Sequence, residues 1–221
     1  MPDDHGLVET LPLAGRLALS YAPAASRMAV LALFALDTRL AGLIRNSTEP
    51  MLAQLRLSWW RETLRRDKRE WPKGEPMLSA LRSWGGAHSD LEALVDGWEA
   101  LTMPPPLTEA ALVQLAEGRG AAFAALAHAV GYAEQAPRAA ALGEGWALAD
   151  LSMRLSRQEE RDAARAIAMA RKVPSLHVSR PLRPLAVLFA LANRRMRKGD
   201  NAAAHSPAAL MLAMRVGLLG R

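Results

Sequence analysis

The sequence has no cysteine and few aromatic or β-branched residues. The absence of cysteine excludes disulfide bonds, cysteine-ligated zinc, iron–sulfur clusters and a thiol nucleophile. Aromatic residues make up 5% of the 221 residues, whereas alanine, leucine, arginine, methionine and glutamate, which favour helices, dominate. No segment alternates apolar and polar residues with the period of two that marks a strand. The composition therefore predicts an all-α protein.

Targeting and membrane-spanning signals are also missing. The N-terminal Met-Pro-Asp-Asp-His is acidic and lacks the basic-then-apolar pattern of a signal peptide. No uncharged run reaches the roughly 18 residues that a membrane span needs. No two histidines have metal-ligand spacing, and no glycine-rich phosphate loop is present. We expect a cytoplasmic protein, or one peripheral to a membrane.

Acidic residues are scarce in the last part of the chain. Residues 163–221 contain eleven lysines and arginines and one acidic residue, Asp200, whereas the net charge of the whole chain is +6. The remainder of the chain is therefore acidic overall. A basic C-terminal part suits an anionic membrane surface or an acidic protein partner, and equally a solvated arginine-rich surface. No recognition motif accompanies the charge, so we do not expect nucleic acid as a partner.

Proline and glycine divide the chain into helical segments without an internal repeat or a linker. Ser26, Thr48 and Ser89 are expected to cap helices at their N-termini, and further helices are expected to start at Thr108 and Ser206. We interpret residues 1–221 as a single domain. The expected helices span residues 11–22, 27–44, 50–69, 76–84, 89–101, 108–130, 137–170, 185–197 and 206–218.

The most informative stretch lies between Arg27 and Leu64. It reads RMAVLALFALDTRLA from residue 27 and EPMLAQLRLSWWRETL from residue 49. These segments resemble the N-terminal part of squalene/phytoene synthases, in which an arginine precedes an ALxAF helix and a proline-containing turn leads into LxxWRxxL. Weaker similarity continues through GAAF at residue 120 and GEGWAL at residue 143.

The resemblance implies an isoprenoid-synthase-like helical bundle around a central cavity. We expect leucine, alanine, phenylalanine and methionine to line that cavity. Compared with the family, the chain looks shortened towards its C-terminus. The resemblance is closest to a divergent branch that lacks the Asp-rich motifs and includes a mitochondrial complex I assembly factor.

The departures from the family concern its metal-binding acids. Active members carry an Asp-rich motif whose carboxylates hold Mg²⁺ and, through it, the substrate diphosphate. Those positions read Ala-Gly-Leu-Ile-Arg at residues 41–45 here. The positions of the acids in the second motif correspond either to Asp150 or to Ser156, Glu159 and Glu160, depending on how the family motif is aligned. A set of Glu159, Glu160 and Asp162 could hold one ion, but neighbouring arginines favour ion pairs within the helix.

The resemblance supplies five candidate ligand-binding residues and no catalytic residue or metal ligand. They are Arg27, Asp37, Arg56, Trp60 and Arg61. Asp37 lies in a very apolar helix and needs a partner, for which we expect Arg56 or Arg61. The arginines suit a diphosphate or lipid phosphate, although capping and ion pairing are commoner roles. Adjacent Trp59 and Trp60 cannot both face the core.

Three functions remain open at this point. The first is a non-catalytic family member, a pseudoenzyme that binds a prenyl-like or lipid ligand or acts with a protein partner in assembly. The second is a Mg²⁺-dependent prenyltransferase of terpenoid synthesis that condenses two prenyl diphosphates. The third is a membrane-surface protein whose binding depends on Arg194, Arg195 and Arg197. The first requires no cofactor, and only the second requires Mg²⁺.

Overall fold

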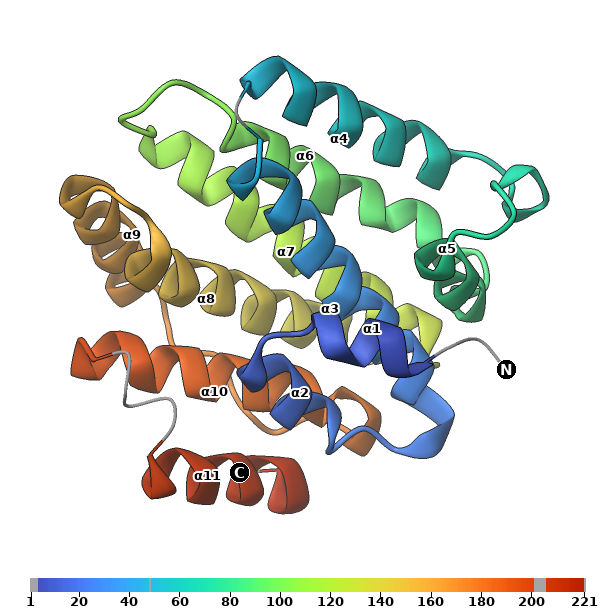
Figure 1. Cartoon of the computed structure of the whole chain (residues 1–221). Coiled ribbons are helices and arrows are strands. Elements are labelled where there is room, and N and C mark those ends of the chain that lie inside the picture. Colours follow the sequence, from blue (N-terminus) through green and yellow to red (C-terminus); the bar gives the residue numbers. More distant parts are fainter. Residues whose placement is uncertain (1–3, 48, 201–205, 221) are drawn as a thin grey trace.

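The computed structural model describes residues 4–47, 49–200 and 206–220, and these form helices and connecting segments without a strand (Figure 1). The prediction of an all-α protein is therefore confirmed. The helices are α1 (Asp4–Thr10), α2 (Leu13–Leu19), α3 (Ala24–Arg45), α4 (Pro50–Arg65), α5 (Pro76–Leu81), α6 (Glu92–Ala100), α7 (Glu109–Ala129), α8 (Ala136–Arg154), α9 (Gln158–Ala170), α10 (Arg183–Lys198) and α11 (Pro207–Met214).

Helices α4, α6, α7, α8, α10 and α11 follow one another from top to bottom in Figure 1, with α3 crossing in front of the middle helices. Glycines let the central helices approach closely. A Cβ at Gly118 of α7 would lie 2.4 Å from the carbonyl oxygen of Ala93, and one at Gly143 of α8 would lie 2.6 Å from that of Arg119. The backbones of α6, α7 and α8 therefore touch, which brings side chains from all three to one place.

Helix α3 is buried along most of its length because its residues from Ala29 to Leu36 are all apolar. It begins at Ala24, so the expectation that Ser26 is its N-cap was wrong. Pro23 precedes the helix, and the Ser26 hydroxyl donates to the Pro23 carbonyl from inside the first turn. The expected Ser89 cap was also wrong, because α6 begins at Glu92 and the Ser89 hydroxyl donates to the Gly86 carbonyl. Thr108 and Ser206, where helices were expected to start, cap α7 and α11 by accepting from the backbone N–H groups of Ala111 and Ala209. Thr48 lies outside the described residues.

The expected helix over residues 137–170 is two helices, because Leu155 and Arg157 are extended. The break is stabilised by Arg161 of α9, whose guanidinium donates to the carbonyls of Leu155 and Ser156. Helix α1 was not expected from the sequence. Among the described residues, none of the helices has the length and apolar character to cross a membrane.

Candidate functional site

A cavity of about 600 Å³ lies between α3, α6, α7 and α8, and we call it the central cavity. The expected apolar lining is present in part, from Phe34, Leu151 and Leu188 among others. The innermost wall is charged, and Asp37, Arg119 and Asp150 meet there.

Arg119 of α7 and Asp37 of α3 form a two-pronged ion pair at this wall. The Nε and Nη2 atoms of Arg119 each donate to one oxygen of Asp37, both at 2.8 Å. Their side chains are 3% and 8% exposed. Trp98 of α6 adds a third hydrogen bond from its Nε1 to Asp37 Oδ1, at 3.0 Å. Both carboxylate oxygens of Asp37 are therefore occupied by protein donors.

The guanidinium of Arg119 also connects α7 to α8. Its Nη1 lies 3.4 Å from an oxygen of Asp150, and its plane lies over the ring of Trp146, 3.9 Å from the ring centre. Burial alone lowers the pKa of the Arg119 guanidinium, but the charges and hydrogen bonds of Asp37 and Asp150 outweigh burial and raise that pKa. Arg119 is therefore a permanent buried cation between two carboxylates.

Three arginines lie on the more exposed part of the lining. Arg154 is 46% exposed at its side chain and pairs with Asp150 at 2.7 Å, while Arg157 is 52% exposed. Arg45 is exposed at the end of α3. Arg154 balances the second acid of the inner wall, which leaves Arg45 and Arg157 as the cations of the outer rim. Together with the apolar sides, this arrangement suits an amphiphile with an anionic end.

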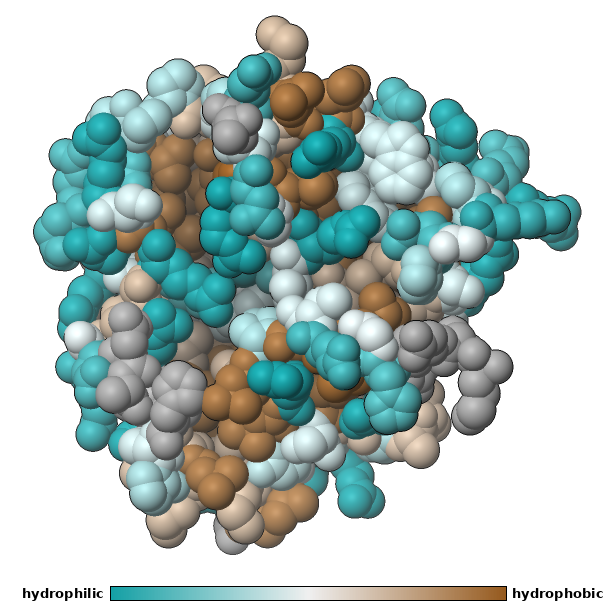
Figure 2. All heavy atoms as spheres, viewed as in Figure 1, coloured by the Kyte–Doolittle hydropathy of each residue, from teal (hydrophilic) through white to brown (hydrophobic). Residues whose placement is uncertain are grey.

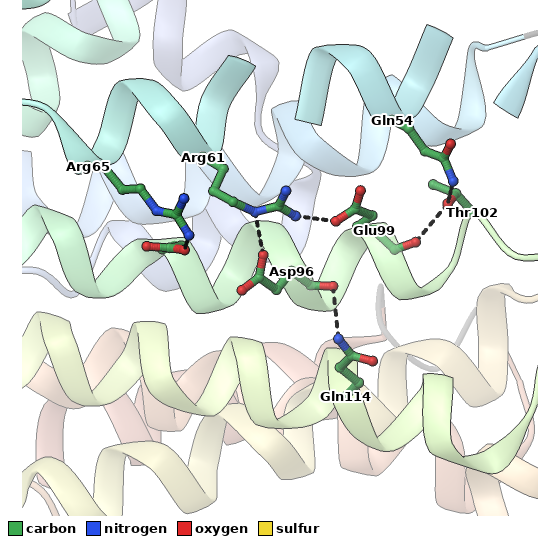
Figure 3. A network of polar contacts seen from close by, with 8 residues as sticks. Gln54, Arg61, Arg65, Asp96, Glu99, Thr102 and Gln114 are labelled. Atoms are coloured by element: carbon green, nitrogen blue, oxygen red, sulfur yellow. Dashed lines mark hydrogen bonds and ion pairs between the residues drawn. The ribbon is translucent and has the colours of Figure 1, made fainter. Parts of the chain in front are cut away.

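The expected partners of Asp37 were wrong. Arg61 is directed towards α6, where it pairs with Asp96 and Glu99 (Figure 3). Arg65 pairs with Glu92 in the same network. Helix α4 packs against α6 through these pairs, and Arg56 lines a different groove. Neither expected arginine is therefore a partner of Asp37, whose donors are Arg119 and Trp98.

The other expected site residues are also dispersed. Arg27 donates to the carbonyl of Leu19 at 3.1 Å and holds α2 against α3. Arg56 and Trp60 line a separate groove of about 880 Å³ between α1, α3, α4 and α5. Trp60 is 3% exposed and Trp59 is 43% exposed, as expected for adjacent tryptophans. Of the five candidates, Asp37 alone is on the central cavity.

The acids of α9 do not converge on one point. Glu160 is buried and accepts from the backbone N–H of Leu107, whereas Glu159 pairs with Arg157. Asp162 accepts from Gln158. Within residues 4–47, 49–200 and 206–220, no group of three or more histidine, cysteine, aspartate or glutamate side chains is placed to hold a metal ion.

Sequence reasoning missed Arg119, which is the centre of the buried cluster. One signal was present, since Arg119 lies between two glycines in a helix that is otherwise apolar on most of its faces. A charged residue there needs a buried partner as much as Asp37 does. Matching the two isolated charges of opposite sign would have identified the pair.

Comparison with protein families gives one finding. The family model described as squalene/phytoene synthase matches residues 16–216. This match includes every residue of the central cluster and supports the isoprenoid-synthase-like bundle expected from the sequence. Neither the curated proteins nor the solved structures give a significant match.

Proposed function

The chain belongs to the squalene/phytoene synthase family, and we propose that it is a non-catalytic member that binds an apolar ligand with an anionic head group in its central cavity without a metal ion. A ligand-binding protein of this kind suits a role in assembly or delivery. Its central cavity of about 600 Å³ falls within the range of roughly 300–1,000 Å³ that is usual for ligand sites.

One observation carries the proposal, and it is the pairing of Arg119 with Asp37 and Asp150. Mg²⁺ needs several oxygen ligands in near-octahedral geometry. The two carboxylates that face the cavity from α3 and α8 already bind a guanidinium, and the acids of α9 have other partners. The residues present therefore do not fit Mg²⁺, and we derive no prenyl transfer through it.

The rim arginines provide the alternative to a metal for holding an anion. A guanidinium binds carboxylate and phosphate oxygens directly and stays charged at any physiological pH. Arg45 and Arg157 lie on the cavity with much of their side chains in solvent, so they are accessible to a head group. Apolar side chains from α3, α8 and α10 would then surround a prenyl-like chain.

The test is a calorimetric titration with farnesyl diphosphate in EDTA and again in excess Mg²⁺. We expect binding that is equal in both buffers and weakened by the double substitution Arg45→Glu/Arg157→Glu. Arg56→Glu is the matched control, because Arg56 is an exposed arginine that lines the groove beside α4 rather than the central cavity. Binding that needs Mg²⁺ would overturn the proposal in favour of a prenyltransferase, and no binding of any apolar anion would refute it.

A further inference from the structure

The last described helical segment is apolar on two opposite faces. It consists of α11, of 8 residues, and the π-helical turn η7 (Arg215–Leu219), of 5 residues. Its inner face carries Ala209, Ala213 and Val216, which are buried in the core. Four large side chains lie on the opposite side: Leu210, Met211, Met214 and Leu218, which are 49%, 70%, 46% and 57% exposed. We call these four residues the outer face.

The sequence spacing explains this arrangement. Positions 210, 211 and 214 of α11 fall within about 100° of one another on an α-helix, with Ala209 and Ala213 on the other side. Leu218 and Val216 follow in the π-helical turn. A helix that is apolar all round is ordinarily buried all round. Here the protein covers one face, and the outer face is left against solvent. Figure 2 shows apolar side chains near the lower edge of the molecule, where α11 lies in Figure 1.

The segment is attached to the bundle by specific contacts, so the outer face has a fixed position. The Nη1 atom of Arg183, at the start of α10, donates to the carbonyl of Gly217 at 3.3 Å and also to that of Leu218. A Cβ at Gly217 would lie 2.3 Å from the Tyr21 ring, so this glycine lets the chain pack directly on the ring. The exposed face is therefore not a consequence of a loosely packed end.

The charges around the outer face are positive. Arg215 is exposed and is the one ionisable residue between residues 206 and 220. Helix α10 runs antiparallel beside α11 (Figure 1), and its last turn ends in exposed Arg197 and Lys198. Residues 163–221 hold eleven basic residues and one acid. An apolar face surrounded by cations complements an anionic membrane, whose head groups are negatively charged and whose interior is apolar.

We propose that the outer face binds an anionic membrane surface, with α11 lying in the plane of the lipid head groups. The segment of 8 and 5 residues is shorter than the roughly 20 residues of a spanning helix, so it fits the interfacial orientation. A second copy fits less well, because a stable interface takes roughly 20–30 residues a side and two basic surfaces repel. The binding is independent of the ligand in the central cavity.

The experiment is vesicle flotation of the full chain, with vesicles of phosphatidylcholine alone or mixed with phosphatidylglycerol. We expect binding to the anionic vesicles and a loss of about tenfold for Met211→Glu/Leu218→Glu. Met51→Glu/Leu55→Glu is the matched control. It places two acids on the exposed apolar side of α4, at the opposite end of the molecule in Figure 1, and should leave binding unchanged.

Charge reversal tests the electrostatic part. Arg197→Glu/Lys198→Glu/Arg215→Glu should weaken binding and reduce its salt dependence. Arg195 is unsuitable for this test, since it is half-buried and donates to the Met153 carbonyl. The proposal would be overturned if Met51→Glu/Leu55→Glu weakened vesicle binding as much as Met211→Glu/Leu218→Glu does. It would also be overturned if the folded wild type did not bind anionic vesicles. A third outcome would also overturn it: the wild type is a dimer in light scattering and binds no vesicles, and Met211→Glu/Leu218→Glu makes it a monomer. A second copy of the chain would then cover the outer face.

Discussion

Replacing Arg119 by methionine is the most informative perturbation of the buried cluster. The substitution keeps an unbranched side chain of similar length but removes the guanidinium. Asp37 and Asp150 would then face each other with side chains 8% and 10% exposed, and Asp37 would keep only the hydrogen bond from Trp98. An uncompensated buried carboxylate is strongly destabilising.

The expected size of the effect follows from the burial. Removing one partner of a buried pair costs about 3–5 kcal/mol of unfolding free energy. Loss of the contact between the guanidinium and the Trp146 ring adds to this cost. The double substitution Asp37→Leu/Arg119→Met removes both charges of the main pair, so it should be more stable than Arg119→Met alone. Arg154→Met is the control, since Arg154 also pairs with Asp150 but is 46% exposed, and it should cost about 1 kcal/mol or less.

Urea unfolding followed by circular dichroism measures all four proteins, with the slopes compared to check that each unfolds in one step. An Arg119→Met variant within about 1 kcal/mol of wild type would refute the reasoning, because the pair would then contribute no more than a surface ion pair. A double variant less stable than Arg119→Met would also contradict the reasoning, because the loss of stability would then come from altered packing and not from the unpaired charge.

Three further predictions concern the same region. Trp98→Phe removes the donor to Asp37 and should lower the unfolding free energy in urea by about 1.5–3 kcal/mol; no change would mean that the hydrogen bond is dispensable. Gly118→Ala places a Cβ 2.4 Å from the Ala93 carbonyl oxygen and should cost about 1–3 kcal/mol, whereas Gly42→Ala meets nothing within 4 Å and should be neutral or stabilising. Equal melting temperatures for these two variants would contradict the close approach of α6 and α7. Millimolar Mg²⁺ or EDTA should leave the thermal midpoint of the wild type unchanged, and a clear rise with Mg²⁺ would show a site that binds the ion in the folded state.

Local sequence signals predicted the helices well where the determinant was close in sequence. Thr108 accepts from Ala111 three residues later, and such a cap is visible in the sequence. The break after α8 was missed. Arg161 donates to the carbonyls of Leu155 and Ser156 at the break, and no proline or glycine at residues 155–157 marks it in the sequence.

The site was predicted less well, for the same reason. Asp37 was correctly identified as a buried acid in need of a partner, but the sequence favoured arginines from the next helix along the chain. The actual partner, Arg119, is 82 residues away on α7, and it meets Asp37 because α7 packs against α3 in the bundle. Arg61, which looked available, pairs with Asp96 on α6.

The buried arginine places a positive charge between carboxylates on facing helices. Two acids pointing into one cavity repel each other and lose hydration, so they need a cation between them. In active members of the family, as the resemblance implies, Mg²⁺ supplies that charge together with the substrate. Here Arg119 supplies it from α7 and is raised in pKa by the two acids, so the charge is present whether or not a ligand is bound. On the function proposed above, an apolar anion would bind and leave through the rim arginines while this inner wall stays unchanged.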